Sequence, residues 1–518
     1  MEDIKKQFVD AITASYSPKG AAIQLGAGIL QGQVLAEAKV NLALKMMNRH
    51  GLIAGATGTG KTRTLQLIAE QLSDAGVPVF MLDVKGDLSG LSQPGTTNEA
   101  LLERGKLVGV PFEPTSFPVE IFSLSGKLGA PMRITIEDFG PILLSRILDL
   151  NDTQSGVLAA LFKYAADQSW PLVDFADVKK LLSYLSEGPG AAAIKDDYGK
   201  ISTATSGTIL RKIVAVEQQG LASIFGEKEF DIEDLFERID GRGVISLLNI
   251  ADIQDQPVLY STFLLSLLSQ LFKQLPEVGD LEKPKLLFFF DEAHLLFNGA
   301  SKAFLTQVEQ IVRLIRSKGV GVFFCTQAAT DIPESVLGQL GNRVQHALRA
   351  FTPNDAENLR KTVRTYPHSK FYEIDKILTS LGTGQALITV LNDKGIPTEV
   401  VATHLVAARA VMGPCSAETY KALINASIFT SKYQRAVNRR SASEIVDEKM
   451  EAVAAQQTAR DEAAASKSKA GKDGGTRSRR QTPLEAAQTQ ASRALAREGV
   501  KILSKIASGI LGAIFKKK

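Results

Sequence analysis

The chain has 518 residues, which is too long for one simple domain and suggests about three structural units. Hydrophobic residues make up 44% of it and charged residues 22%, as in a soluble globular protein with enough chain for a large core. The formal net charge is +4, which is mildly basic and compatible with nucleic acid as a partner.

Several kinds of protein are excluded by what the sequence lacks. The only two cysteines, Cys325 and Cys415, support neither a disulfide framework nor a metal site, and the five histidines show no metal-ligand spacing. The first residues do not form a signal peptide, and no run of about 18 apolar residues exists. We therefore expect a cytoplasmic protein without a membrane-spanning helix.

The first 45 residues change pattern near residue 20. Ile4, Phe8 and Ile12 predict a short amphipathic helix, whereas residues 21–44 consist of short apolar runs separated by glycines. The second pattern predicts a few strands with tight turns. We assign residues 1–45 to an N-terminal helix and a small β subdomain, or flap, too short for a complete barrel.

The next stretch contains a phosphate-binding loop. Residues 51–62 read GLIAGATGTGKT and match the pattern G-x-x-x-x-G-K-[ST]. Glycines let backbone N–H groups turn inward around phosphate oxygens, Lys61 adds a charge for the β- and γ-phosphates, and the Thr62 hydroxyl can hold Mg²⁺. A short apolar strand precedes the loop, and a helical pattern follows it whose dipole also favours phosphate. The predicted nucleotide-binding residues are Gly55, Ala56, Thr57, Gly58, Thr59, Gly60, Lys61, Thr62 and Arg63.

An apolar run at residues 77–83 predicts a second buried strand of an α/β sheet. Asp83, Lys85 and Asp87 follow at its carboxyl end, where such sheets place ligands. These side chains either face the Mg²⁺ and the attacking water or form an ordinary polar exit from the strand. Both interpretations stay open.

The middle of the chain alternates between strand and helix patterns. Residues 107–123 favour further strands, and we assign residues 46–135 to the first part of an ATPase core. Residues 136–240 are mostly helical in pattern, which indicates an insertion of roughly 100 residues, large enough for its own core.

The sheet resumes in residues 241–415, the second part of the core. An apolar strand at residues 285–290 ends in Asp291 and Glu292, the second nucleotide motif. Asp291 is expected to hold Mg²⁺, and Glu292 to polarise the attacking water as a general base. Because Mg²⁺ offsets their mutual repulsion, two acids at this position have an electrostatic purpose.

A further buried strand over residues 319–327 ends in Gln327, which either senses the γ-phosphate and orients water or caps the strand. Residues 343–351 predict another strand. Residues 384–390 and 399–405 predict a closing antiparallel pair joined by a turn at 392–395.

The last hundred residues differ in composition. Residues 416–482 form a helical or low-complexity linker, within which 463–480 are low in apolar content and expected to be disordered. Residues 483–518 predict a basic amphipathic helix, in which isoleucines recur every four positions over 502–514 and basic residues every four positions over 493–505. This helix either docks on the protein or a neighbouring subunit, lies on a membrane surface, or contacts nucleic acid.

With both nucleotide motifs identified, the chain resembles the HerA–FtsK superfamily of P-loop ATPases, most of all bacterial HerA-like ATPases of the YjgR type. The resemblance covers about residues 20–415 and rests on four segments, residues 48–62, 77–90, 290–297 and 326–327. It implies a RecA-like core with a mainly parallel sheet, ATP hydrolysis with Mg²⁺, and a homo-hexameric ring that translocates on double-stranded DNA. HerA itself has a fuller N-terminal β domain, so the resemblance does not extend to the nuclease partnership of HerA.

The resemblance also implies that a neighbouring subunit supplies an arginine to the ATP site. A guanidinium there can stabilise charge that develops on the γ-phosphate. Arg343 and Arg211 are the two candidates; the alternative for each is a surface or ion-paired arginine.

Three functions are compatible with these patterns. The first is an ATP-driven motor on double-stranded DNA. The second is an ATPase switch or assembly factor that acts on protein or membrane partners, with residues 484–518 as an anchor. The third, an inactive nucleotide-binding scaffold, is disfavoured because Lys61, Thr62, Asp291 and Glu292 are all present.

Overall fold

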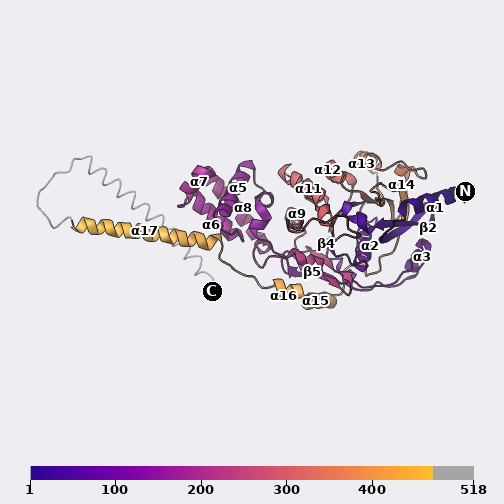
Figure 1. Cartoon of the computed structure of the whole chain (residues 1–518), viewed down its shortest axis with the longest axis horizontal. Helices are drawn as coiled ribbons and strands as arrows, with labels where there is room; N and C mark the ends of the chain where they lie inside the picture. The colour runs from indigo at the N-terminus through magenta and orange to yellow at the C-terminus, as the bar shows by residue number, and fades with distance from the viewer. Residues whose placement is uncertain (1, 301, 350, 471–518) are drawn as a thin grey trace. The chain divides into compact units, whose positions relative to one another are not determined.

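The computed structural model describes residues 2–300, 302–349 and 351–470 (Figure 1). Its main feature is a twelve-stranded sheet in the order β2-β1-β14-β13-β12-β3-β11-β10-β4-β9-β5-β6. The strands of this sheet are β1 (Ala22–Leu30), β2 (Gln33–Ala43), β3 (Gly51–Ala54), β4 (Val79–Asp83), β5 (Val119–Ser123), β6 (Ala130–Pro131), β9 (Ile245–Asn249), β10 (Leu286–Phe290), β11 (Val320–Thr326), β12 (Asn342–Gln345), β13 (Gln385–Thr389) and β14 (Val401–Leu405). A separate small ribbon pairs β7 (Arg238–Ile239) with β8 (Arg242–Gly243).

The eight strands from β12 to β6 are parallel. Every residue of β3, β4, β9, β10 and β11 is buried, because helices cover both faces of the sheet. Because both faces of these strands are buried, their sequences are continuous apolar runs, the pattern from which they were predicted. The mainly parallel α/β sheet expected from the sequence is confirmed.

The other four strands extend the sheet in antiparallel fashion. β13 pairs with both β12 and β14, which confirms the predicted closing pair. β1 then pairs with β14 at Gly26 opposite Leu405, and β2 pairs with β1. A Cβ on Gly26 would lie 2.1 Å from the His404 carbonyl oxygen, so glycine permits this close approach. The strands predicted as an N-terminal flap, β1 and β2, therefore form the edge of the main sheet, because β1 pairs with β14.

The prediction of strands over residues 107–123 is correct only for β5. Helix α3 (Glu99–Val108) occupies the first part, with Asn98 accepting a hydrogen bond from the Leu101 N–H as its N-cap. Gly109 ends the helix at a φ of 69°, a left-handed conformation that favours glycine. Short apolar runs beside glycine and proline do not distinguish a helix end from a strand.

Alternate residues of each strand face two buried clusters. Phe80, Phe288 and Phe324 belong to one face, which is covered by α9, α11 and the helical insertion. Met81 and Phe323 belong to the opposite face, together with residues of α1 and α2. Besides α3, the α-helices outside the insertion and before residue 440 are α1 (Glu2–Tyr16), α2 (Lys61–Asp74), α9 (Pro257–Gln274), α10 (His294–Phe297), α11 (Lys302–Ile315), α12 (Glu334–Leu337), α13 (Pro353–Val363), α14 (Ile374–Ser380), α15 (Ala417–Ala426) and α16 (Ile428–Tyr433).

The predicted insertion is helical, and α5 to α8 gather into one group (Figure 1). It comprises α4 (Ile136–Ile147), α5 (Asp152–Asp167), α6 (Phe175–Ser186), α7 (Ala191–Asp197) and α8 (Thr203–Gln218). Its buried residues, such as Leu161 and Leu181, belong to the same apolar cluster as Phe80 of the sheet. The insertion therefore packs as a continuation of the core rather than around a core of its own.

The chain divides into two compact units, Met1–Lys449 and Met450–Lys518. Helix α17 (Ala442–Ala470) extends into the stretch where disorder was expected, because an alanine-rich sequence has high helix propensity even when it is polar. The rest of that stretch, and the predicted basic helix over 483–518, lie outside the described residues. Among the described helices, none has the length and apolar content to cross a bilayer.

Candidate nucleotide site

The phosphate loop joins the end of β3 to the start of α2. Gly55, Gly58 and Gly60 have φ values of 155°, 77° and 112°, conformations that side chains rarely adopt. A Cβ on Gly55 would lie 2.5 Å from the Cβ of His346. The glycine pattern is therefore required both by the backbone path and by a neighbouring strand.

Contacts within the loop hold it in a turned conformation. The Lys61 ammonium donates to the Gly55 carbonyl at 2.7 Å and to the Ala56 carbonyl at 3.3 Å. The Thr59 hydroxyl donates to the same Ala56 oxygen at 2.7 Å. The Lys61 ammonium thus lies over the loop, where it can exchange these carbonyls for phosphate oxygens.

The loop has the donors that an anion needs. In the described part of the chain, no backbone hydrogen bond is formed by the N–H groups of Gly58 and Gly60. The first N–H groups of α2, from Lys61 onward, have no partner inside the helix. Thr57, Gly58 and Thr62 are exposed. These groups can donate hydrogen bonds to an anion at the positive end of α2.

The second motif lies at the end of β10, two strands from β3. Asp291 Oδ1 accepts a hydrogen bond from the Glu292 N–H at 2.9 Å. Burial raises the pKa of Asp291, and the Glu292 carboxylate raises it further, while hydrogen bonds from the Glu292 N–H and the Cys325 thiol and the Lys61 charge oppose that rise. Lys61 and Asp291 therefore face the same space, because β3, β11 and β10 are neighbours in the sheet.

The donor set fits Mg²⁺ only together with a nucleotide. Among the described residues, no group of three or more His, Cys, Asp or Glu side chains could hold a metal. Thr62 and Asp291 offer one hydroxyl and one carboxylate, and Mg²⁺ usually combines such a small protein set with water and substrate phosphates.

Glu292 has a strained backbone, with a φ of 50° in the left-handed region. Its Oε2 lies 3.3 Å from His294 Nδ1, although the geometry is not that of a hydrogen bond. Tyr260 of α9 lies beside both acids, and its pKa is raised to about 12 by burial and by the Glu292 and Asp291 charges. The side chain predicted to act as general base is thus surrounded by polar groups.

Gln327 follows β11, between the loop strand and the acid strand. It is exposed and lines a cavity of about 450 Å³ together with His294 and Asp331. Asp331 Oδ2 accepts hydrogen bonds from the Thr326 hydroxyl at 2.6 Å and the Ala328 N–H at 2.9 Å, which fixes the turn after the strand. The structure therefore places Gln327 at the carboxyl edge of the sheet, as predicted from its position.

Asp83 forms the polar exit of its strand. It is buried, and its two oxygens accept hydrogen bonds from the N–H groups of Asp87 and Leu88 at 3.0 and 3.2 Å. Burial raises the pKa of Asp83 to about 6. Of the two interpretations of this segment, the contacts favour the capping role for Asp83.

The two candidate arginines lie in different surroundings. Arg343, at the start of β12, donates through Nε, Nη1 and Nη2 to the carbonyls of Leu340, Thr365 and Leu337. Arg211 is exposed on α8 and donates to the Thr208 hydroxyl at 2.9 Å. Neither lies at the phosphate loop of its own chain. Their action in a neighbouring subunit stays a prediction.

His346 is a site residue that the sequence did not indicate. It follows β12, and its N–H donates to the Ala54 carbonyl at 2.7 Å. Its ring lies 2.9 Å from the Thr64 hydroxyl and 3.0 Å from the Gln385 carbonyl, and it is fully buried. Burial lowers the pKa of His346 to about 4, and the nearby Lys61 charge lowers it as well. His346 therefore supports the loop from behind as a neutral ring.

Cys325 is a second residue that was missed. It is buried at the end of β11, and its thiol donates to the Asp291 carboxylate. Burial raises the pKa of the Cys325 thiol well above its usual value, so the sulfur stays protonated. No local pattern could have paired two residues on separate strands.

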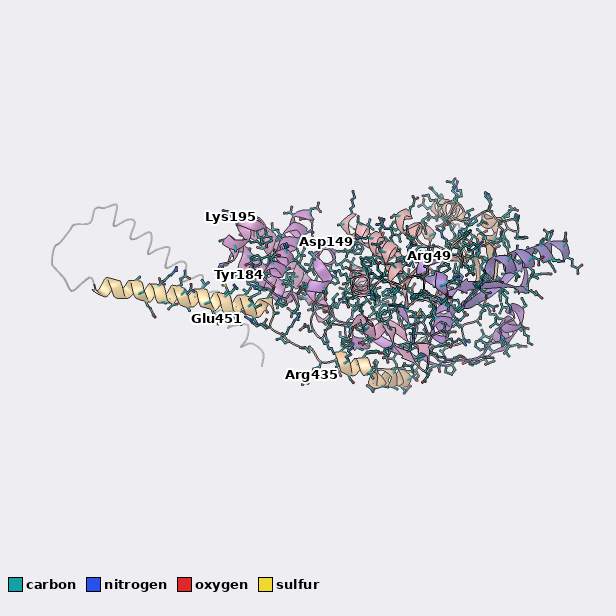
Figure 2. The ribbon with its side chains drawn as sticks, in the orientation of Figure 1. Arg49, Asp149, Tyr184, Lys195, Arg435 and Glu451 are labelled. Carbon is teal, nitrogen blue, oxygen red and sulfur yellow. The ribbon has the colours of Figure 1, made fainter. Side chains whose placement is uncertain are left out.

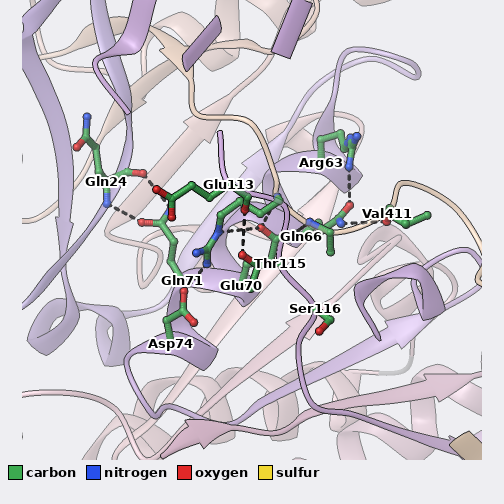
Figure 3. A network of polar contacts seen from close by, with 12 residues as sticks. Gln24, Arg63, Gln66, Glu70, Gln71, Asp74, Glu113, Thr115, Ser116 and Val411 are labelled. Atoms are coloured by element: carbon green, nitrogen blue, oxygen red, sulfur yellow. Dashed lines mark hydrogen bonds and ion pairs between the residues drawn. The ribbon is translucent and has the colours of Figure 1, made fainter. Parts of the chain in front are cut away.

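The outer face of α2 is held by the segment that follows β14. Glu70 is fully buried and accepts hydrogen bonds from the Arg409 and Ala410 N–H groups at 2.7 and 3.1 Å. The Gln66 amide donates to the Val411 carbonyl at 3.2 Å. Figure 3 shows this network, which includes Gln24, Arg63, Gln66, Glu70, Gln71, Asp74 and Val411.

The same segment encloses a cavity of about 290 Å³ that borders the end of the phosphate loop at Gly60. Its lining is mostly apolar, and two arginines, Arg63 and Arg104, contribute to it. Burial lowers the pKa of both guanidinium groups.

A buried strand, a glycine loop and a helix, with an acidic pair two strands away, define a P-loop nucleoside triphosphatase. A family model described as "Helicase HerA-like C-terminal" matches residues 29–518. The chain therefore belongs to this family, within the HerA–FtsK class of P-loop ATPases that the sequence resembles.

Individual relatives are distant. The chain is similar to the "DNA double-strand break repair helicase HerA" of Sulfolobus acidocaldarius, with 20% identity over 372 residues, 68% of this chain. The match spans 64% of that relative. Two solved structures are also similar. The bacterial conjugative coupling protein TrwB has 13% identity and a TM-score of 0.48, over 77% of this chain and 97% of that one. VirB4 of Thermoanaerobacter pseudethanolicus has 16% identity and a TM-score of 0.46, over 75% of this chain and 98% of VirB4.

Proposed function

We propose that the protein is an ATP-hydrolysing motor that forms a homo-hexameric ring and translocates on double-stranded DNA. One observation carries the ATPase part of this proposal. The phosphate loop, Gln327 and the Asp291–Glu292 pair lie at the carboxyl ends of three neighbouring parallel strands, β3, β11 and β10.

In this proposal each residue acts on a particular part of the nucleotide. The loop N–H groups and Lys61 bind the β- and γ-phosphates, and the cavity beside Gly60 receives the nucleoside. Thr62 and Asp291 would hold Mg²⁺, which neutralises charge on the phosphate oxygens. Glu292 orients and deprotonates the attacking water, and Gln327 contacts the γ-phosphate or that water.

Double-stranded DNA and the ring are inferred from family membership. The name of the archaeal relative describes a DNA repair helicase, and a ring would let a neighbouring subunit contribute Arg343 or Arg211. A guanidinium from a second chain stabilises the transition state only when the subunits are assembled, which couples turnover to the ring.

The decisive experiment compares ATP turnover with and without linear duplex DNA. The wild type is assayed beside Glu292→Gln and beside Glu334→Gln, an exposed glutamate of α12 that serves as the matched control. Duplex DNA is expected to raise turnover several-fold in the wild type and the control, while Glu292→Gln is inactive. Native mass spectrometry of Glu292→Gln with ATP measures the number of subunits.

Turnover that requires Glu292 but ignores DNA at every salt concentration would remove the DNA part of the proposal. The ATPase would then be a switch or assembly factor for a protein or membrane partner. Turnover that survives in Glu292→Gln would refute the assignment of the general base.

A further inference from the structure

An open cavity of about 500 Å³ lies at the opposite edge of the sheet from the phosphate loop. It is bordered by His50, directly before β3, and by Gly341, directly before β12. β3 and β12 are parallel, so both residues mark the amino ends of their strands, whereas the loop follows the carboxyl end of β3. The cavity is therefore separate from the nucleotide site.

Among the residues that the structure describes, three arginines line this cavity and no carboxylate does. They are Arg49, Arg316 and Arg343. Arg49, labelled in Figure 2, ends the short 3₁₀ helix Leu44–Arg49 that precedes β3. Three positive charges around one cavity without a carboxylate in its lining create a field that attracts anions.

Arg343 is fixed in place by its own chain. Its Nε, Nη1 and Nη2 atoms donate to backbone carbonyls at 3.2, 3.0 and 3.3 Å. A guanidinium has five N–H donors, so two remain for a ligand, one on each terminal nitrogen. Carbonyl acceptors hold the group without neutralising its charge.

Arg49 and Arg316 have no such anchors. Within the residues that the structure describes, neither side chain forms an ion pair or a hydrogen bond. Both charges act on His50, which is 1% exposed: burial lowers the pKa of His50 to about 4, and repulsion from Arg316 and Arg49 adds to that effect. Both arginines therefore line the same cavity as this buried ring and are near enough to act on its charge.

His50 does not offset this charge. Its Nδ1 accepts a hydrogen bond from the Val322 N–H at 3.0 Å, so the neutral ring carries its proton on Nε2. A neutral donor beside three cations adds no negative charge. An anion in the cavity would relieve the mutual repulsion of the arginines.

From this cluster we propose that the cavity binds a phosphate group of an anionic ligand. Guanidinium groups bind phosphate through paired N–H donors, and a cavity of this size has room for more than one phosphate. The phosphate belongs either to a free polyphosphate or to a nucleic-acid backbone. The first source is independent of the proposed motor, and the second rests on it.

The test uses the full-length chain with Lys61→Ala, which removes the charge of the phosphate loop. Pyrophosphate binding is measured by calorimetry, and binding of a labelled duplex of about 20 base pairs by anisotropy over a salt series. Arg316→Ala and Arg49→Ala are compared with Arg313→Ala. Arg313 and Arg316 are both exposed and lie three residues apart, so the control matches in charge and position.

For a free polyphosphate, Arg316→Ala and Arg49→Ala weaken pyrophosphate binding about tenfold or more, the value of a charged hydrogen bond, and Arg313→Ala does not. If the ligand is a nucleic-acid backbone, Arg316→Ala and Arg49→Ala each reduce by about one the slope of the logarithm of duplex affinity against the logarithm of salt concentration. The proposal is overturned when neither ligand separates these variants from the control. It is also overturned when Arg316→Ala changes only the oligomeric state, because the cavity then meets a carboxylate of a second copy. Glu292→Gln tests the ATPase separately and does not depend on this cavity.

Discussion

The neutral His346 ring, which lies behind the phosphate loop, should contribute to the free energy of unfolding in a pH-dependent way. The Gln385 carbonyl can only accept, so His346 Nδ1 carries the proton and Nε2 accepts from the Thr64 hydroxyl. In His346→Asn, the amide nitrogen can still donate to the Gln385 carbonyl, but the Thr64 hydroxyl keeps only its longer hydrogen bond to the Gly60 carbonyl, at 3.3 Å. At pH 7.5 the free energy of unfolding should fall by about 1 kcal/mol, the net value of one lost hydrogen bond.

The difference in stability between the two proteins should shrink on acidification and then change sign. The pKa of His346 is about 4 in the folded chain and 6.5 in the unfolded one. The unfolded state therefore binds the proton first as the pH falls, and the wild type loses stability between pH 6.5 and 4. The full loss is about 3 kcal/mol, and at pH 5 it is about 2 kcal/mol. Asparagine does not titrate, so His346→Asn does not lose stability in this way.

Urea unfolding at pH 7.5 and pH 5, followed by circular dichroism, measures both differences. All other groups titrate in both proteins and cancel, so the stability of the wild type relative to His346→Asn should fall by about 2 kcal/mol, from about 1 kcal/mol above the variant at pH 7.5 to about 1 kcal/mol below it at pH 5. His368→Asn, at an exposed position, controls for the chemistry of the substitution. A gap that stays constant between the two pH values would refute the account of a buried neutral histidine.

Three further predictions concern other buried groups. Gly55→Ala should abolish binding of a fluorescent ATP analogue, because its Cβ would lie 2.5 Å from His346; Gly58→Ala, with open space around it, should retain more binding. Glu70→Gln should lower the free energy of unfolding by about 2 kcal/mol in thermal melts, since two N–H donors lose their charged acceptor. Burial and a neighbouring carboxylate raise the pKa of Glu229 to about 7, so the folded state holds this proton more tightly than the unfolded state does. Glu229→Gln should therefore be more stable than the wild type at pH 8, with the gain disappearing towards pH 5.

Each of these has a contrary outcome. Equal ATP binding by Gly55→Ala and Gly58→Ala would show that the loop tolerates a side chain beside the histidine. An unchanged melting temperature in Glu70→Gln would mean that the network on α2 does not depend on the carboxylate charge. A gain in Glu229→Gln that is independent of pH would point to packing rather than titration.

The local chemistry of the site could be predicted because the residues of each nucleotide motif are consecutive in the sequence. The phosphate loop occupies eight consecutive residues, and its preceding strand and following helix are contiguous with it. Asp291 and Glu292 likewise follow directly on five apolar residues of one strand. Local patterns of this kind fix backbone conformation and the end of a strand without knowledge of distant neighbours.

Other parts could not be predicted, because they depend on residues that meet only in the folded chain. His346 and Gly55 are 291 positions apart, and their contact follows from the pairing of β12 with β3. Cys325 reaches Asp291 because β11 lies beside β10. The place of β1 in the sheet depends on β14, which is formed almost four hundred residues later.

The amino-acid sequence by itself thus determined the class of fold, the phosphate loop and the acidic pair, since each depends on apolar periodicity and residue type within a few positions. Strand order was decided by the tertiary structure, as were the buried histidine behind the loop and the three arginines at the far edge. Their positions follow from which strands pair across long separations, and loop closure and side-chain packing set those pairings rather than any local pattern.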